Sequence, residues 1–438
     1  MTQSFRIRVE NICILILGFL SLGMFALSFF HHLPAEAALL VSTEMDWMVQ
    51  RASSFVLLLF VTRILGIADG GTFSLAFSTA QILLTVGKFG IRSFQATDLK
   101  QEIPFSTYLQ TRIWLCCSML LLCLCYVIFR KYSLERSCIF LAVCFIKMSD
   151  AVEDVFHGEL QSHNKLDVAG KLLTVRNLFT MLLFGTTLFL FGNLLSSCIT
   201  TAVLSLLCTL LLNIIVTRKY IPVSLSFDKD KSLKILLACL PLFVGSFLSL
   251  YIYNAPKYAI DLFGSQEQIA VYSIIFMPAF VINLFSEFIF KPLLTQIAHL
   301  WNTQNYFAFQ KLMKRFVGYI FLITILVISI SWFIGVPILS FVYGVDISSY
   351  RWELTILLTA GGFSAAVYLF YNMLTSMRKQ KIIMINYVVA ACSITALTYF
   401  MTARWNITGA AYSYLITEIV LMMGMMGSIR YYLKCSEC

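Results

Sequence analysis

Charged residues are scarce in this sequence, and long polar stretches are missing from it. Only 12% of the residues are Asp, Glu, Lys or Arg, whereas 59% are hydrophobic and the mean hydropathy is +0.84. A water-soluble domain usually contains about 25% charged residues, so this composition excludes an ordinary soluble fold. The longest polar stretch, residues 291–315, includes Trp301, Tyr306 and Phe307 and is typical of an interfacial connector. We therefore expect no separate soluble domain.

Signatures of enzymes, metal sites and nucleic-acid binding are missing as well. The five histidines are scattered around the ends of apolar runs, and no His–Asp, Ser–His or paired-carboxylate motif stands out. Most of the 13 cysteines sit inside apolar runs, where they act as small hydrophobic residues. The net charge of +10 comes without zinc-finger spacing and without a basic helix that has interleaved aromatic residues. We expect no catalytic residue, no metal or cofactor and no nucleic-acid partner.

Apolar runs of about 20 residues recur along the whole chain, each long enough to cross a hydrocarbon core of about 30 Å. Backbone groups in lipid must form hydrogen bonds within their own segment, and the runs lack strand alternation, so only helices fit. The sequence thus predicts an all-α polytopic membrane protein. Its twelve core transmembrane helices are expected at residues 45–62, 72–86, 113–129, 138–156, 172–191, 195–216, 235–253, 269–290, 316–342, 354–377, 382–400 and 407–426.

The distribution of Lys and Arg predicts the orientation of these helices, because basic residues accumulate in cytoplasmic loops. Alternate loops are basic, from Lys88, Arg92 and Lys100 near the start to Arg430 and Lys434 after the last helix. They hold about three times as many basic residues as the opposite loops, which is a strong orienting asymmetry. We predict a multi-pass protein of the inner cell membrane with a cytoplasmic C-terminus.

An additional apolar run at residues 11–30 does not fit this alternation. It follows Arg6 and Arg8, and it precedes a small-residue segment at 35–37 that is similar to a signal-peptidase site. The run spans the membrane, lies on its surface or is cleaved. We favour an added or interfacial helix outside the twelve.

Both ends of the twelve-helix core are therefore expected in the cytoplasm. Reporter fusions after Lys234 and after Tyr432 should both report a cytoplasmic location, because both sites follow strongly basic segments. A periplasmic or extracellular signal at either site would contradict the predicted topology.

The twelve helices divide into two sets of six at the most basic loop. In each half, a glycine after the first helix (Gly66 and Gly264) is followed by a short polar turn and an aromatic–Ser–apolar entry into the next helix. Internal repeats of this kind are typical of transporters, which hold substrate between the repeats near the membrane midplane. The predicted organisation is an apolar extension at 1–44, a bundle at 45–216, a cytoplasmic linker at 217–234, a second bundle at 235–428 and a cytoplasmic tail at 429–438.

Four segments show a family resemblance: VTRILGIADGGTFSLAFSTA (61–80), VGKFGIRSFQATDLK (86–100), PLFVGSFLSLYIYNAPKYAID (241–261) and FMPAFVINLFSEFIFKPLL (276–294). They resemble the oligosaccharide flippases of bacterial surface-polysaccharide synthesis, in the multidrug/oligosaccharidyl-lipid/polysaccharide exporter superfamily. The resemblance covers essentially the whole chain from Met45 onward. It implies two six-helix bundles around a central cavity that opens alternately to each side. It also implies a lipid-linked oligosaccharide on a polyprenyl diphosphate as cargo, membrane lipids as surroundings, and glycan polymerases and glycosyltransferases as partners.

Ionisable residues inside a membrane are costly, so each of them is a functional candidate. Lys147, Asp150 and Asp154 lie at i, i+3 and i+7 on one helix face, and Glu418 lies near the middle of the last helix. A diphosphate in a low-dielectric cavity needs matched positive charge, and Arg can bind it with two hydrogen bonds. The predicted substrate-binding residues are Arg63, Arg92, Arg112, Lys147, Arg176, Lys257 and Lys291. The predicted ion-coupling or gating residues are Asp150, Glu153, Asp154, Glu287 and Glu418.

Structural explanations remain open for several of these residues. Arg92, Arg112 and Arg176 lie near cytoplasmic helix ends, where the distribution of positive charge would place them without any role in binding. For Glu418, a static ion pair with a basic residue of another helix is the alternative to a coupling role.

Two other functions remain open as well. One is a small-molecule efflux antiporter of the same superfamily, because similarity of fold does not separate cargoes. The other is a membrane enzyme of glycan assembly, which the short external loops disfavour.

Overall fold

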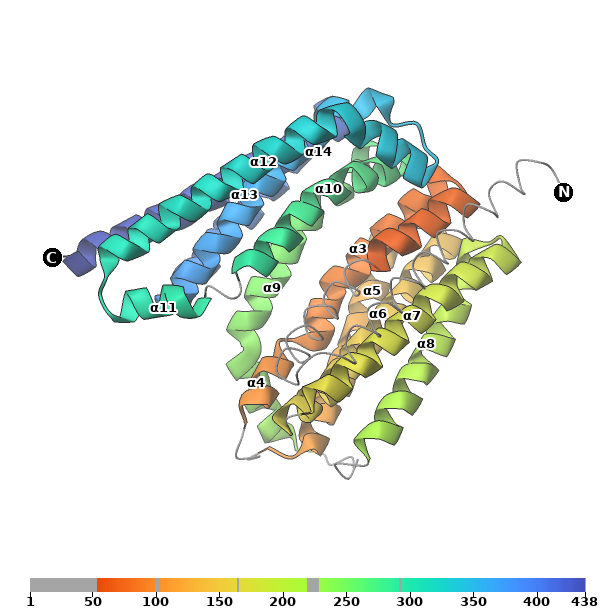
Figure 1. Ribbon diagram of the computed structural model, residues 1–438. Helices are drawn as coiled ribbons and strands as arrows, with labels where there is room; N and C mark the ends of the chain where they lie inside the picture. Colours follow the sequence, from red (N-terminus) through yellow and green to blue (C-terminus); the bar gives the residue numbers. More distant parts are fainter. Residues whose placement is uncertain (1–52, 99–102, 164, 219–227, 291–293, 438) are drawn as a thin grey trace, which may run out of the picture. The chain divides into compact units, whose positions relative to one another are not determined.

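The computed structural model describes residues 53–98, 103–163, 165–218, 228–290 and 294–437 (Figure 1). These ranges are helical and contain no strand, which confirms the predicted all-α class. Each predicted core helix overlaps an observed one, with the last two inside a single helix, and residues 45–52 and the apolar run at 11–30 lie outside the described residues. The helices are Ser53–Ile64, α3 (Ile67–Lys88), α4 (Ile91–Thr97), α5 (Phe105–Phe129), α6 (Leu134–Ser162), α7 (Leu166–Phe191), α8 (Leu194–Thr217), α9 (Lys229–Phe263), α10 (Gln266–Phe290), α11 (Leu294–Asn302), α12 (Tyr306–Tyr343), α13 (Arg351–Ser376) and α14 (Gln380–Glu437), with a short 3₁₀ turn at Ser348–Tyr350.

Local signals in the sequence set several helix ends. The side chains of Asn193 and Asn305 accept hydrogen bonds from the backbone N–H three residues onward and so cap the starts of α8 and α12. α7 and α12 end at Gly192 and Gly344, whose positive φ angles of 58° and 69° suit glycine best. The hydropathy pattern predicted the spans, and these caps explain why several of the helices end where they do.

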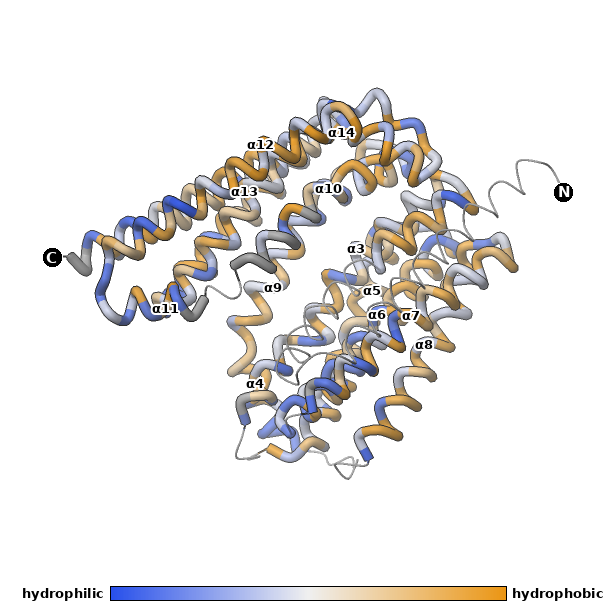
Figure 2. Tube along the Cα trace, viewed as in Figure 1, coloured by the Kyte–Doolittle hydropathy of each residue, from blue (hydrophilic) through white to orange (hydrophobic). Residues whose placement is uncertain are grey.

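Eight helices among the described residues are long and apolar enough to cross a membrane. One of them is α14, which contains both of the last two predicted spans and is interrupted by a non-helical backbone at Asn406 (φ 47°). Figure 2 shows orange along much of the tube of α12, and the exposed large apolar residues of this helix include Phe321, Leu326, Phe333 and Phe341. Large exposed apolar surface on long helices is the property that lipid requires.

Contacts divide the chain into two compact units whose boundaries differ from simple sequence order. Among the described residues, one unit comprises those from Ser53 to Gly66 together with those from Thr79 to Leu240, and the other comprises Ile67–Ser78 together with those from Pro241 onward. The first turns of α3 therefore belong with the second half of the chain, and the first turns of α9 belong with the first half. Each compact unit thus contains a helical segment that belongs, by sequence order, to the opposite half of the chain.

The two units have corresponding central helices. In the first unit, α6 packs against α4, α5, α7 and α8. In the second unit, α13 packs against α10, α11, α12 and α14. Each corresponds to the fourth predicted span of its half, and each half also has a short helix, α4 or α11, after the helix of its second predicted span. This correspondence agrees with the internal repeat expected from the sequence.

The start of α3 packs tightly on α10 within the second unit. The hydroxyl groups of Ser74 and Ser273, which occupy equivalent places in the two sequence repeats, lie 2.6 Å apart. Thr72 also donates a hydrogen bond to the side chain of Gln266. A Cβ atom at Gly71 would overlap the backbone of Gln266, so only glycine allows this approach. Small residues at close helix crossings are typical of membrane bundles.

Helix α8 is polar on its buried side and apolar on its exposed side. The buried side contains a polar row that repeats every fourth residue, Ser197, Thr201, Ser205, Thr209, Asn213 and Thr217, beside the buried Leu194, Cys198 and Ala202. The exposed side consists of Ile199, Val203, Leu207, Leu211 and Ile215. Small hydroxyl side chains let α8 approach α6 closely, whereas large apolar side chains suit lipid tails.

We predict that Ser205→Phe lowers the free energy of unfolding by about 1–3 kcal/mol, because a large side chain cannot fit at this fully buried position. The matched control is Leu207→Phe on the exposed side of the same helix, which should leave stability unchanged. Thermal unfolding of the purified protein in detergent measures both. Equal melting temperatures for the two variants would contradict the assignment of the buried face.

Candidate functional site

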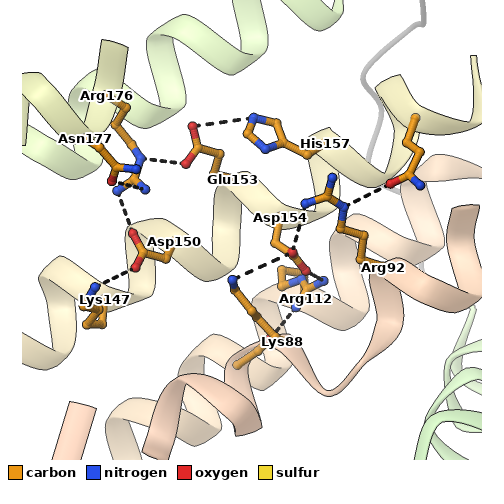
Figure 3. A network of polar contacts seen from close by, with 12 residues as sticks. Lys88, Arg92, Arg112, Lys147, Asp150, Glu153, Asp154, His157, Arg176 and Asn177 are labelled. Atoms are coloured by element: carbon orange, nitrogen blue, oxygen red, sulfur yellow. Dashed lines mark hydrogen bonds and ion pairs between the residues drawn. The ribbon is translucent and has the colours of Figure 1, made fainter. Parts of the chain in front are cut away.

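Helix α6 contains a run of charged side chains that are withdrawn from solvent. Lys147, Asp150, Glu153 and Asp154 are all buried and occupy successive turns near its centre. Burying a charge costs several kcal/mol unless an opposite charge or a ligand compensates it. Figure 3 shows that these side chains reach partners on neighbouring helices. The partners divide the charges of α6 into two clusters of different character.

The first, which we call the balanced cluster, consists of Lys147, Asp150, Glu153 and Arg176 (Figure 3). The Arg176 guanidinium on α7 lies 2.6 Å from Asp150 Oδ1 and 2.6 Å from Glu153 Oε2. Lys147 Nζ lies 3.0 Å from Asp150 Oδ2, and His157 Nε2 lies 3.6 Å from Glu153 Oε1. The two basic groups and the two carboxylates compensate each other, so this cluster ties α7 to α6 without a net charge.

The second, the Asp154 cluster, consists of Lys88, Arg92, Arg112 and Asp154. Arg112 on α5 lies 2.9 Å from Asp154 and also donates a 2.7 Å hydrogen bond to the carbonyl of Gly87. Lys88 Nζ and Arg92 Nη1 each lie 3.9 Å from the same carboxylate. Among the described residues, three basic groups therefore share one carboxylate, and positive charge is in excess.

The Asp154 cluster also has a buried and an accessible side. The side chains of Arg112 and Asp154 are 1% and 9% exposed, whereas those of Lys88 and Arg92 are 28% and 30% exposed. An anion that approaches this cluster would meet Lys88 and Arg92 first. Excess positive charge in a partly desolvated setting favours binding of phosphate groups.

The structure brings together most of the predicted residues of the first half. Arg112, Lys147, Asp150, Glu153, Asp154 and Arg176 lie in the two clusters, as does the half-buried Arg92. Arg63 is partly buried near the end of the helix Ser53–Ile64. The side chain of Glu287 and the residue Lys291 lie outside the part of the chain that the structure describes. The roles assigned to all of these residues remain predictions.

Sequence reasoning missed three participants. Lys88 was interpreted only as a loop charge, although its spacing of four from Arg92 was a usable signal. His157 lies one turn after Glu153 and contacts its carboxylate. Gln95 on α4 donates a 2.8 Å hydrogen bond to Glu159 on α6, and an uncharged residue gives no signal of such a role.

The second unit contains two buried charges of opposite sign that do not pair. Lys257 Nζ donates a 2.9 Å hydrogen bond to Ser78 Oγ, and no ion pair involves Lys257 in the described part of the chain. The polar neighbours of the Glu418 carboxyl group are the hydroxyl groups of Tyr414 and Ser364. No ion pair of Glu418 is found among the described residues, so the static pair considered from the sequence is not observed.

Comparison with known protein families identifies the chain. Residues 45–298 match the family described as polysaccharide biosynthesis protein. The chain belongs to this family. The matched region contains both clusters of α6 as well as Lys257, whereas Glu418 lies beyond it. A comparison with curated proteins gave no match.

Solved structures share the fold at low sequence identity. An inward-facing multidrug resistance MATE family transporter of the MOP superfamily is 12% identical, with 89% of this chain and 95% of that chain covered and a TM-score of 0.70. The lipid II flippase MurJ, in an inward closed conformation, is 14% identical, with 88% and 87% covered and a TM-score of 0.68. A MOP superfamily transporter from Pyrococcus furiosus is 12% identical, with 91% and 95% covered and a TM-score of 0.61. The fold is therefore that of MOP superfamily transporters.

The contacts of Arg176 in the balanced cluster predict how a structural ion pair differs from a substrate ligand when this residue is replaced. Arg176→Gln should lower the free energy of unfolding by about 3–5 kcal/mol, because it leaves buried carboxylates uncompensated. Adding Glu153→Gln to this variant removes one of those charges and should recover much of the stability, since Lys147 still pairs with Asp150. Melting curves of the purified proteins provide the measurement. A single variant with normal stability would show that Arg176 is not committed to these partners.

Proposed function

We propose that this protein flips a polyprenyl-diphosphate-linked oligosaccharide from the cytoplasmic to the outer leaflet by alternating access, for surface polysaccharide synthesis. The main support is the excess of positive charge in the Asp154 cluster, where Lys88, Arg92 and Arg112 share one carboxylate. A diphosphate supplies the negative charge that such a cluster lacks, and guanidinium groups bind phosphate oxygens in pairs.

Family membership adds independent support for this cargo. The family is described by polysaccharide biosynthesis, and one protein of the same fold is described as a lipid II flippase. A small-molecule efflux antiporter is the competing proposal, because other proteins of this fold are multidrug transporters. Cationic drugs would be repelled by the Asp154 cluster, so the charge favours an anionic cargo.

The clusters suggest a division of roles within the first unit. Lys88 and Arg92 would make the first contact with phosphate, and Arg112 would bind from the buried side. Lys147 and Arg176, which the sequence suggested as ligands, would instead hold α7 against α6, because their charges are compensated. Lys257 has no carboxylate partner in the described chain and remains a proposed second ligand.

The cellular setting proposed here follows from the cargo and from the basic loops. The protein is a multi-pass membrane protein, and we propose the inner membrane with a cytoplasmic C-terminus. Glycosyltransferases would build the lipid-linked substrate on the cytoplasmic side. A glycan polymerase would consume it on the other side.

The test of this function uses the accessible members of the Asp154 cluster. Lys88→Gln and Arg92→Gln should each reduce flipping of a fluorescent polyprenyl-diphosphate-linked oligosaccharide in proteoliposomes by about tenfold, since each removes one phosphate-binding charge. Lys171→Gln is the matched control, because the Lys171 side chain is 73% exposed and its one ion pair in the described part of the chain is with Asp167. Unchanged flipping in both cluster variants at normal protein levels would contradict the proposed site.

A coupling role is proposed for Glu418, which lies buried beside Tyr414 and Ser364 without a basic partner among the described residues. A lone carboxyl group in a low-dielectric setting favours uptake of a proton or cation, which would link transport to an ion gradient. Asp150, Glu153, Asp154 and Glu287 were also predicted from the sequence. Asp150 and Glu153 both pair with Arg176, so the structure supports a coupling role less for them than for Glu418.

Glu418→Gln should give a folded carrier whose flipping no longer responds to an imposed proton or sodium gradient, because Gln mimics the protonated acid. Glu353→Gln is a matched control in the same unit, since Glu353 is also buried but accepts a hydrogen bond from Thr408. Flipping in proteoliposomes with and without the gradient is the measurement. A normal gradient response in the Glu418 variant would exclude the coupling role.

A further inference from the structure

Asp154 has an unusual position among the buried carboxylates of the first unit. Asp150 and Glu153 belong to a cluster in which acids and bases are equal in number. Asp154 instead faces three basic groups, at 2.9 Å from Arg112 and at 3.9 Å from both Lys88 and Arg92. It thus holds these groups together while leaving two positive charges uncompensated among the described residues.

The geometry of this cluster makes Asp154 a competitor of any bound anion. Arg112 is buried, and its contact with a carboxylate is through Asp154 at 2.9 Å. Lys88 and Arg92 are more exposed and lie farther from the carboxylate, and Arg92 Nε also donates a 3.2 Å hydrogen bond to Gln161. A phosphate group can bind Lys88 and Arg92 directly. A phosphate oxygen can reach the Arg112 Nη2 that contacts Asp154 only by displacing the Asp154 carboxylate from it.

We propose that Asp154 is a resident counter-anion that occupies the phosphate position in the empty carrier and reclaims the three basic groups when the cargo leaves. This inference rests on the proposed binding of diphosphate at the same cluster. In the empty protein, Asp154 compensates part of a charge that would otherwise be costly to bury. In the loaded protein, it opposes the bound phosphate by electrostatic repulsion. Its role is therefore to weaken binding and to speed release.

A carrier needs such a residue because it must bind its cargo and then give it up. Three basic groups without Asp154 would attract a diphosphate more strongly and retain it for longer. A residue with a purely structural role behaves differently, because its removal weakens binding and stability together. Tighter binding after loss of an acid is thus the diagnostic result.

The experiment measures binding of farnesyl diphosphate to the full-length protein in nanodiscs, with farnesol and inorganic pyrophosphate as separate probes of chain and headgroup. Asp154→Asn should bind farnesyl diphosphate about tenfold more tightly, with a correspondingly slower dissociation rate. The matched control Asp150→Asn removes an acid from the balanced cluster and should tighten binding much less than Asp154→Asn, because Asp150 pairs directly with Lys147 and Arg176. The affinities of the variants for pyrophosphate should follow the same order as their affinities for farnesyl diphosphate. The affinity for farnesol should be the same in all variants.

Asp154→Asn leaves the buried Arg112 with the carbonyl of Gly87 as its remaining hydrogen-bond partner among the described residues, so a second variant controls for loss of folding. Combining Asp154→Asn with Lys88→Gln restores the original net charge and should return the affinity close to that of the wild type. Unchanged or weaker binding in Asp154→Asn, with weaker binding in Arg92→Gln, would overturn the counter-anion role and leave the binding site intact. Equal affinity of the wild type for farnesol and farnesyl diphosphate would overturn both proposals.

Discussion

A charge that is buried among helices must find an opposite charge or a ligand, and the first unit is organised around this constraint. Arg176 joins α7 to α6 through two carboxylates, and Arg112 joins α5 to α6 through a third. The Arg112 guanidinium also holds the end of α3 through the carbonyl of Gly87. One set of contacts therefore fixes four helices, and the same contacts leave positive charge available beside Asp154. Structure and proposed function depend on the same residues here.

Apolar packing alone cannot assemble such a bundle, because lipid tails solvate leucine as well as a protein interior does. Two other kinds of contact hold the helices together in place of apolar packing. Ion pairs connect α6 to its neighbours, and rows of small polar residues allow close approach, as on the buried side of α8. The apolar side chains of α8 point the other way, so this helix reverses the usual pattern of a soluble protein.

The two units place the same helix at their centre but stabilise it differently. In α13, the counterpart of α6, the buried Glu353 accepts a hydrogen bond from Thr408, and two glycines lie at close helix contacts: a Cβ atom at Gly361 would press on Ala279, and one at Gly362 would press on Thr324. Close backbone contact thus contributes in α13 where α6 has ion pairs. Two further buried charges of the second unit, Lys257 and Glu418, lie on other helices and face hydroxyl groups. The two halves therefore share an arrangement of helices but differ in their buried polar contacts.

The sequence by itself determined the helical class, the approximate positions of the helices and the position of the charged face on α6, because hydropathy and helical spacing are local properties. It also pointed to Arg92, Arg112 and Asp154 as separate candidates. Only the tertiary structure decided which charges are compensated, since Arg112 and Asp154 come from different helices and meet through folding. The tertiary structure likewise placed Arg176 in the balanced cluster and Arg92 in the Asp154 cluster, to which it also added Lys88. It assigned the first turns of α3 to the second unit. These outcomes depend on contacts between distant segments, which no local pattern specifies.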